Sequence, residues 1–411
     1  MSAVEKYDLT TTERLNADRF PELGTGPVPI EPFVSEDFLA DECEHIFSKV
    51  WLLAGRVERI PNPGDFFVKR VECLDKSAII VRGRDGVIRA FYDVCRHRGT
   101  NVSNGDHGNC KFFTCRFRGW VYDTEGKIKH IPDESQFHTL DKSKLNLDAI
   151  HCEVWNGFIF INFAEKPKEA LRQQLSPLAE KLDEFPAEQM VEVGHWGATL
   201  KANWKLFLDA FQEGYHVDTV HAGTIGVYFT GARNPTCRPY HLELYEKNRA
   251  ASFSYNPDYT PKPSEVFAVQ IGDSLSQGAE AARRKLPGIN PDDDPYYSFD
   301  INGVFPNWLL DTSAGFFFIH EFWPIDANTT RWESELHFFP AQNASQLIAQ
   351  EQSIALLRDA FREDIATSEG SQAGMRSGSL KEINFADTEI TCRHSLNAIM
   401  RMIREGKQAA S

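Results

Sequence analysis

A short segment in the second half of the chain carries two histidines and two carboxylates and constrains the fold more than any other feature. Asp209, Glu213, His216 and His221 lie within thirteen residues of one another. Histidines at such close spacing are typical of a bound metal ion. On a regular helix, with about 3.6 residues per turn, their side chains would point about 140° apart. The helix must therefore loosen or end near residues 217–220 if both histidines bind one ion.

Two neutral imidazoles and one carboxylate on one face of an ion form the facial triad of non-haem iron(II) sites, which leaves open positions for O2 and substrate. The third ligand must come from elsewhere in the chain. The alternative places His216 on a solvated helix face, together with Lys205, Asp209, Gln212 and Glu213. Context outside the segment has to decide between the two.

That context is a pair of cysteine motifs upstream. Cys95-Arg96-His97 is followed, after seventeen residues, by Cys115-Arg116-Phe117-Arg118-Gly119-Trp120. A Rieske [2Fe-2S] centre has two cysteine ligands on one iron and two histidine ligands on the other, and its motifs are Cys-x-His and Cys-x-x-His. Cys95, His97 and Cys115 match three of these four ligands. With both metal motifs in the same order, the chain resembles over nearly its whole length the catalytic α subunit of Rieske non-haem iron ring-hydroxylating oxygenases.

The resemblance implies where the third ligand of the mononuclear iron lies. In the family it is an aspartate on a helix near the C-terminus, often preceded by an acidic residue and followed by Gln-x-Gly. Here Glu363-Asp364 precedes Gln372-Ala373-Gly374. We therefore expect His216, His221 and Asp364 to bind Fe(II).

Helical periodicity supports Asp364 independently. Within residues 347–368 one apolar stripe contains Ile354, Leu357, Phe361 and Ile365. Asp364 lies on the edge of this stripe, whereas Asp359 and Glu363 are expected to point elsewhere. The alternative for Asp364 is a carboxylate hydrogen-bonded to buried backbone or to an arginine.

Glu213 has its own role by resemblance. In relatives an acidic residue three positions before the first histidine ligand hydrogen-bonds a Rieske histidine of the neighbouring subunit and bridges the two metal centres for electron transfer. Aspartate is commoner at this position than glutamate. The alternative is an exposed helix carboxylate.

Arg118 is the main departure from the family pattern, because it stands where the second Rieske histidine is expected. A guanidinium remains protonated and has no lone pair for iron. His107 and Cys110 are conceivable substitutes in the intervening hairpin, although neither position is a ligand in the family. By resemblance, Arg118 would face Glu213 across a subunit boundary, which could preserve assembly while it interrupts electron transfer.

Two further classes of protein compete with an active oxygenase. A zinc-stabilised binding protein could use Cys95, His97, Cys110 and Cys115 as a tetrahedral site, but it leaves the histidine pair unexplained. A catalytically silent relative would be inactivated by Arg118. Zinc without sulfide would indicate the first class, and lack of activity with the reductase present would indicate the second.

The resemblance implies an α+β fold, with a β-rich Rieske domain and a catalytic domain whose antiparallel sheet is wrapped by helices in a helix-grip (START-like) arrangement. We expect an N-terminal segment at 1–45 that packs with the catalytic domain, the Rieske domain at 46–166 and the catalytic domain at 167–411. The sequence predicts a helix capped by Ser35. Strands are predicted at 66–71, 78–81, 87–91, 154–163, 315–323 and 330–339. Residues 222–303 are predicted to form a long loop, either a lid or a disordered surface segment.

Composition excludes several partners. A formal net charge of −15 disfavours nucleic acids and anionic membranes. Residues 1–20 are polar without the apolar core that a signal peptide carries, and the sequence has no uninterrupted stretch of eighteen apolar residues, so we expect a cytoplasmic protein. The eight cysteines show no disulfide framework, which favours reduced thiols.

The resemblance also implies partners and substrate. A separate NADH-dependent reductase, sometimes with a ferredoxin, would supply electrons, and the chain would form a trimer with or without β subunits. The aromatic residues of 305–323 include pocket lining by resemblance, although plain core packing is the alternative. We expect hydroxylation or oxidative demethylation of a small aromatic or apolar substrate, as in aromatic hydrocarbon catabolism. A quaternary ammonium or amine is the alternative substrate, because aromatic walls attract cations.

Overall fold

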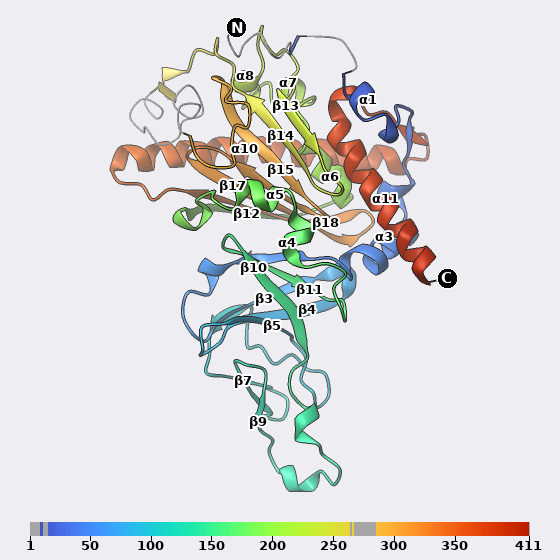
Figure 1. The fold of residues 1–411 in the computed structure, drawn as a ribbon, viewed down its shortest axis with the longest axis vertical. Helices are drawn as coiled ribbons and strands as arrows, with labels where there is room; N and C mark the ends of the chain where they lie inside the picture. Colours follow the sequence, from blue (N-terminus) through green and yellow to red (C-terminus); the bar gives the residue numbers. More distant parts are fainter. Residues whose placement is uncertain (1–8, 11–14, 264, 267–284, 411) are drawn as a thin grey trace. The chain divides into compact units, whose positions relative to one another are not determined.

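The computed structural model describes residues 9–10, 15–263, 265–266 and 285–410. Their contacts divide the chain into two compact units (Figure 1). One unit, here the catalytic unit, comprises the described residues of Met1–His45 and Leu175–Ser411, and the other, here the Rieske unit, comprises Ile46–Gln174. The N-terminal segment therefore groups with the C-terminal part of the chain, and the boundary after the Rieske unit lies at Gln174 rather than at the expected 166.

The Rieske unit contains two antiparallel sheets. The larger sheet has the strand order β2-β11-β10-β5-β4-β3-β6 and the smaller one β7-β8-β9. Their bounds are β2 Leu52–Arg56, β3 Asp65–Val71, β4 Lys76–Arg82, β5 Ile88–Tyr92, β6 His107–Asn109, β7 Phe112–Thr114, β8 Val121–Asp123, β9 Ile128–His130, β10 Ala149–Trp155 and β11 Phe158–Asn162. The predicted strands at 66–71, 78–81 and 87–91 are confirmed by β3, β4 and β5.

The strand predicted at 154–163 is confirmed over most of its length by β11 and by the last two residues of β10, but the turn of the hairpin between these strands interrupts it. Asn156 and Gly157 have φ angles of +45° and +79° at the turn. Asn-Gly is the pair that most readily adopts two positive φ angles in a two-residue hairpin loop. The apolar residues on both sides of this pair hid the turn in the sequence.

The catalytic unit is built on one seven-stranded antiparallel sheet in the order β12-β18-β17-β16-β15-β14-β13. Its strands are β12 Val191–Leu200, β13 His241–Leu244, β14 Arg249–Ser254, β15 Tyr297–Val304, β16 Trp308–Thr312, β17 Phe316–Asp326 and β18 Thr329–Phe338. The α+β class and the strands at 315–323 and 330–339 are confirmed. The loop predicted over 222–303 is wrong in part, because it contains β13, β14 and most of β15; its residues 264 and 267–284 lie outside the described part.

Helices surround this sheet. The principal ones are α2 Glu31–Val34, α3 Glu36–Glu42, α5 Leu178–Leu182, α6 Trp204–Ala210, α7 Val217–Val220, α8 Gly226–Phe229, α10 Ala344–Arg376 and α11 Ile390–Ala410. The side chain of Ser35 accepts a hydrogen bond from the N–H of Phe38, which confirms the predicted cap of α3. None of the described helices is both long and apolar enough to span a membrane.

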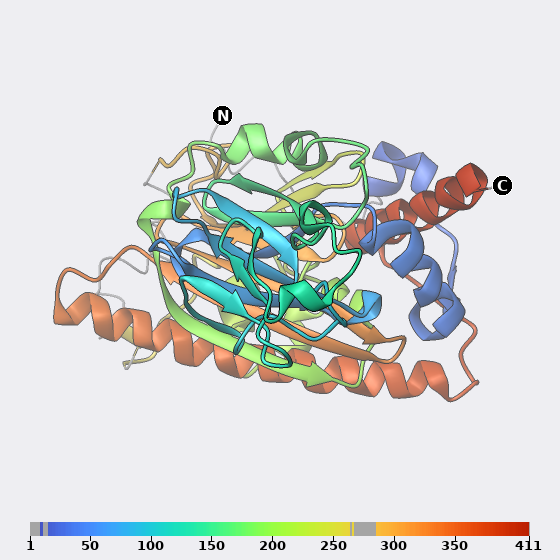
Figure 2. The same ribbon diagram turned by 90° about the horizontal axis from the view of Figure 1, so that it is seen from below.

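The long helix α10 packs against one face of the seven-stranded sheet of the catalytic unit and runs along β12 (Figure 2). Its Ala349, Ile354 and Leu357 join a cluster with Phe318 and Leu336 of the sheet. Apolar residues three or four positions apart share one face of a helix, so this stripe faces the sheet. Further along, the buried positions of α10 include polar residues, which form the site described next.

Candidate metal centres

The two histidines bracket a single turn of helix. Helix α6 ends at Ala210, His216 precedes α7 and His221 follows it. The helix ends at Val220, as expected, although residues 217–220 themselves are helical, and residues 211–216 before them are irregular. Because the chain turns on both sides of α7, the rings can converge despite their five-residue spacing.

The structure brings His216, His221 and Asp364 together. Nε2 of His216 lies 3.3 Å from Nε2 of His221, and Oδ1 of Asp364 lies 3.1 Å from the latter and 3.6 Å from the former. Donor atoms about 2.1 Å from one ion, at right angles to each other, are about 3 Å apart. The spacing matches a facial set of three ligands.

The donor set also fits a cation chemically. Asp364 is 5 % exposed, and its Oδ1 is buried without a hydrogen-bond donor in the described part of the chain. The short distance to His221 lacks the geometry of a hydrogen bond, so an unpaired carboxylate oxygen faces two imidazole nitrogens. A divalent ion satisfies all three lone pairs at once.

Two carboxylates hold the far sides of the imidazoles. Glu213 Oε1 lies 2.5 Å from Nδ1 of His216, and Glu363 Oε2 lies 2.8 Å from Nδ1 of His221. Thr224 donates to the same oxygen of Glu363 at 2.6 Å. An acceptor at Nδ1 places the ring proton there and leaves Nε2 free as a metal ligand.

The expectation that Glu363 points away from the site is wrong, because its longer side chain reaches His221 from the flank of α10. The signal was its position beside Asp364, since outer carboxylates commonly support metal-bound histidines. For Glu213 the structure shows a contact with His216 of its own chain. Asp359 instead pairs with the adjacent Arg358 at 2.8 Å.

Gln372 fixes the start of α6 relative to α10. Its Oε1 accepts the N–H of Asn203 at 2.9 Å, and its Nε2 donates to the carbonyl of Phe33 at 3.0 Å and to Asn328 at 2.9 Å. Asn203 in turn caps α6 by accepting the N–H of Lys205. The Gln-x-Gly motif thus positions the helix that leads to the histidines.

Burial and neighbouring carboxylates determine the charges around the site. Burial opposes protonation of His221, but Asp364 and Glu363 outweigh it and raise the pKa of its imidazole. On α6, burial raises the pKa of the Asp209 carboxyl to about 7, although a hydrogen bond from Gln212 partly opposes the rise. A bound cation would replace the proton that the carboxylates favour on His221.

In the Rieske unit, two similar loops present the three candidate cluster ligands. Gly99 donates its N–H to the carbonyl of Cys95, and Gly119 donates to that of Cys115, each at 2.9 Å. Both glycines have positive φ, +81° and +71°, which L-residues with a Cβ seldom adopt. The loops bring the two buried cysteines close enough for their thiols to interact.

Aromatic side chains contact Cys95 and His97 in these loops. Burial raises the pKa of the Cys95 thiol, whereas a contact with the Tyr122 hydroxyl at 3.4 Å lowers it. His97 stacks on Trp120 with ring centroids 4.9 Å apart. The contact of Tyr122 with Cys95 was not predicted, although Tyr122 lies in the segment that flanks the second motif.

Arg118 takes the fourth position without offering a ligand. Its guanidinium is exposed and lies 3.8 Å above the ring centroid of Phe117. Burial lowers the pKa of His97, and the positive charges of Arg118 and Arg98 lower it further. The residues present therefore supply three ligands and do not fit a complete Rieske cluster.

The conceivable substitutes do not complete the set. His107 is exposed on β6, in register with Phe67. The thiol of Cys110 is half-buried, and the charge that acts on it is that of Arg84. In the described part of the chain, only two groups of three His, Cys, Asp or Glu donor atoms lie within 4.8 Å of one another. Neither includes Cys95, His97, Cys110 or Cys115, so these four do not form the single-ion zinc site of the alternative interpretation.

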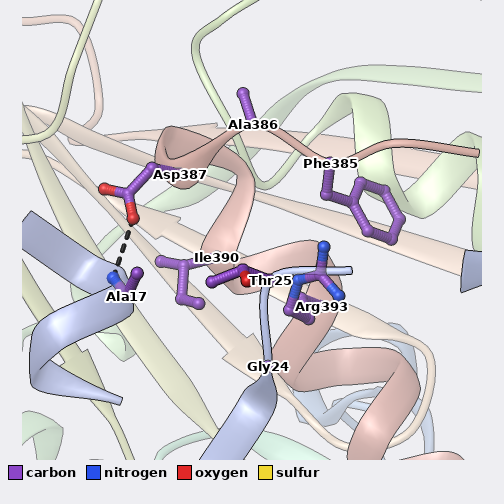
Figure 3. A pocket seen from close by; sticks show the side chains of 8 residues that line it. All are labelled: Ala17, Gly24, Thr25, Phe385, Ala386, Asp387, Ile390 and Arg393. Carbon is purple, nitrogen blue, oxygen red and sulfur yellow. Dashed lines mark hydrogen bonds between the residues drawn. The ribbon is translucent and has the colours of Figure 1, made fainter. Parts of the chain in front are cut away.

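A surface pocket of about 240 Å³ lies between the N-terminal segment and the start of α11 (Figure 3). Its polar groups have partners, because Asp387 accepts the N–H of Ala17 at 2.7 Å and Arg393 donates to the carbonyl of Gly26 at 2.9 Å. None of the three candidate iron ligands lines it. The pocket therefore belongs to the anchoring of the N-terminal segment.

Comparison with protein families agrees with both centres. The family described as ring hydroxylating alpha subunit (catalytic domain) matches residues 187–405. The Rieske [2Fe-2S] domain family matches residues 50–150. The two matches include all the candidate ligands named above.

Individual relatives fall into two groups. The chain is 33 % identical to benzene 1,2-dioxygenase subunit alpha of Pseudomonas putida over 196 residues, which are 47 % of this chain and 42 % of that protein. It is 25 % identical to the carnitine monooxygenase oxygenase subunit of Escherichia coli (strain K12) over 356 residues, 85 % of this chain and 84 % of that protein. The match to the first relative thus spans less than half of that relative's length.

Solved structures show the same fold. The quaternary ammonium Rieske monooxygenase CntA with a bound inhibitor superimposes with a TM-score of 0.74 at 19 % identity, covering 93 % of this chain and 97 % of that chain. Naphthalene 1,2-dioxygenase from Rhodococcus sp., bound to indole, gives 0.73 at 19 % identity and covers 96 % and 97 %. Together with the two family matches, these findings show that the chain belongs to the Rieske ring-hydroxylating oxygenase α subunits, oxidoreductases with a [2Fe-2S] domain and a mononuclear iron catalytic domain.

Proposed function

We propose that the chain is a terminal oxygenase component that inserts oxygen from O2 into a small substrate with an apolar or aromatic surface, by hydroxylation or oxidative demethylation. The observation that carries this proposal is the convergence of His216, His221 and Asp364, with an unpaired buried oxygen on the aspartate. Fe(II) held there would supply the reductive activation of O2 and leave positions open for it.

The residues of the chain would orient this chemistry and exclude water from it. Glu213 and Glu363 hold the imidazoles of His216 and His221 with Nε2 toward the ion. Phe211 packs near the site, with its ring centroid 4.3 Å from that of His320 and 5.9 Å from that of Phe361. Aromatic walls next to a metal suit an apolar substrate surface and keep bulk water away.

Delivery of electrons is where we propose that this chain is impaired. A separate NADH-dependent reductase, with or without a ferredoxin, would supply electrons, and Glu213 would connect neighbouring subunits in a trimer, with or without β subunits. Because Arg118 leaves the cluster one ligand short, we propose that the sequence as it stands turns over poorly. Native mass spectrometry should show three copies of the chain, and a fully active monomer would contradict the bridging role of Glu213.

The iron site is tested by Asp364→Ala, with Asp359→Ala as the matched control on the same helix. Asp364→Ala removes one of three ligands and should lose most of the mononuclear iron, measured by metal analysis after anaerobic loading. Asp359 pairs with its neighbour Arg358 in the described part of the chain, and its variant should keep the iron. Full iron retention and product formation in Asp364→Ala would remove this aspartate from the site.

A further inference from the structure

Asp311 is a buried carboxylate in the seven-stranded sheet of the catalytic unit, on the face that the iron ligands approach. It lies on β16, in register with Ile301 of β15 and with Phe318 of β17. Directly opposite residues in neighbouring strands share one face of a sheet. Phe318 packs in a cluster with Ala349 of α10, and α10 also carries Asp364. Asp311 therefore lies on the same side of the sheet as an iron ligand.

The carboxylate of Asp311 has no partner among the described residues. Asp311 is 3 % exposed, and its Oδ1 is shut off from solvent without a hydrogen-bond donor. Burial raises the pKa of its carboxyl, and the nearby carboxylate of Asp300 raises it further. A buried, unpaired carboxylate costs free energy, which a hydrogen-bond donor, a cation or protonation of the carboxylate can recover.

Arg249 is a buried cation on the same face of the sheet, and its Nη1 and Nη2 have no hydrogen-bond partner among the described residues. It donates through Nε to Gln212. Burial lowers the pKa of its guanidinium, and the charges that raise it are those of Cys392 and Asp209. Asp311 is not among the groups that act on it, so this arginine does not neutralise Asp311.

The surroundings of Asp311 suit an organic cation. Phe318 stacks with Phe316 at a centroid distance of 5.9 Å, and Phe299, two residues before Ile301 on β15, stacks with Phe253 at 5.3 Å. Aromatic faces attract cations, most strongly where water is excluded. His320, two residues after Phe318, adds no competing positive charge, because burial lowers its pKa to about 3.

We infer that Asp311 is a specificity-determining residue that binds the positively charged nitrogen of the substrate, an organic ammonium whose apolar substituents lie against Phe318 and Phe299. The inference rests on the proposed oxygenase function, which it narrows to cationic substrates. A neutral carboxylic acid in an apolar core is the competing account of Asp311, and it predicts no preference for charge.

Two isosteric probes separate these accounts. Phenyltrimethylammonium and tert-butylbenzene have the same shape and differ by one positive charge. Binding of each to the iron-loaded full chain is measured by isothermal titration calorimetry. We expect the cation to bind at least about tenfold more tightly than the neutral probe, because the carboxylate and the aromatic walls favour only the charged one.

Asp311→Asn keeps the shape of the side chain and removes its charge. In this variant the preference should fall to about twofold or less, with binding of tert-butylbenzene unchanged. Asp258→Asn, at an exposed position, is the control and should keep the preference. A preference that survives in Asp311→Asn overturns the inference.

The wild-type comparison stands by itself if circular dichroism shows that Asp311→Asn does not fold. Equal or tighter binding of the neutral probe to the wild-type chain then overturns the inference without any variant. Failure of the proposed function is distinguishable, because it shows as absence of iron at His216, His221 and Asp364. Loss of the charge preference with that iron in place leaves the oxygenase proposal standing and removes only the role of Asp311.

Discussion

Each candidate ligand histidine is held at Nδ1 by one carboxylate. Glu363 can be tested by mutation without changing Glu213, the expected bridge between subunits. Glu363→Gln keeps the size of the side chain but removes the negative charge from the hydrogen bond to His221. Mutation of a carboxylate that holds a metal-binding histidine typically weakens metal affinity about 10- to 100-fold. We expect Fe(II) affinity, measured by chelator competition, to weaken within that range, with the fold preserved. Unchanged affinity would show that Glu363 does not support the ligand.

Asp209 makes stability depend on pH. Its carboxyl has a pKa of about 7 in the folded chain because of burial, well above the value of about 3.9 expected in an unfolded chain. The folded state therefore holds this proton more tightly, so the stability it contributes is complete below about pH 4 and is lost as pH rises toward 7. Asp209→Asn should remove this loss, which amounts to no more than about 4 kcal/mol.

Urea unfolding of the iron-free chain at pH 5 and pH 7.5 measures the effect. The wild type should lose more unfolding free energy between these pH values than Asp209→Asn does. Asp258→Asn, which removes an exposed carboxylate, should behave like the wild type. Equal losses in Asp209→Asn and the wild type would mean that the carboxyl is already ionised at pH 5.

At the scale of elements, Gln372 connects α10 to the start of α6 and to the N-terminal segment. Gln372→Ala leaves the buried N–H of Asn203 and the carbonyl of Phe33 without their partners. Each unsatisfied buried group costs about 1–3 kcal/mol. We expect the unfolding free energy to fall by about 2–5 kcal/mol in chemical denaturation, whereas Ser371→Ala, at the exposed neighbouring position, should change it by less than about 0.5 kcal/mol. A neutral Gln372→Ala would show that α6 is held by other contacts.

The elements that could be predicted from the sequence are those with a local signal. The cap at Ser35 and the strand at 66–71 follow from side-chain chemistry and alternation. The hairpin at Asn156-Gly157 was missed because apolar residues continue on both sides. The strands β13 and β14 were missed because Gly-, Pro- and Asp-rich neighbours dominate their surroundings. The two strands pair with each other, and β14 joins the sheet by long-range pairing with β15.

The candidate site divides in the same way. His216, His221 and Asp364 could be predicted because their residue types and order carry the chemistry. Glu363 had only the weak signal of its position beside Asp364, because its contact with His221 depends on how α10 is rotated against α7. The unpaired state of Asp311 also depends on tertiary packing, since nothing in its local sequence shows that no donor reaches it.

The whole molecule combines a candidate mononuclear iron site, with all three expected ligands together, and a Rieske unit that is one ligand short. Arg118 extends its guanidinium over Phe117 and lowers the pKa of His97, after burial, by its charge. A fixed positive charge at that position repels the metal whose ligand it replaces. The chain should therefore bind iron at His216, His221 and Asp364 while it lacks a functional cluster.

The most direct test is visible and electron paramagnetic resonance spectroscopy of the anaerobically purified chain beside Arg118→His. We expect a weak or absent Rieske signal in the chain as it stands. In Arg118→His we expect the brown absorbance, the reduced-state resonance signal and reductase-coupled turnover together, because the fourth ligand is restored. A full Rieske signal with normal coupling in the unmodified chain would contradict the account and would mean that another residue, with His107 the first to examine, completes the cluster.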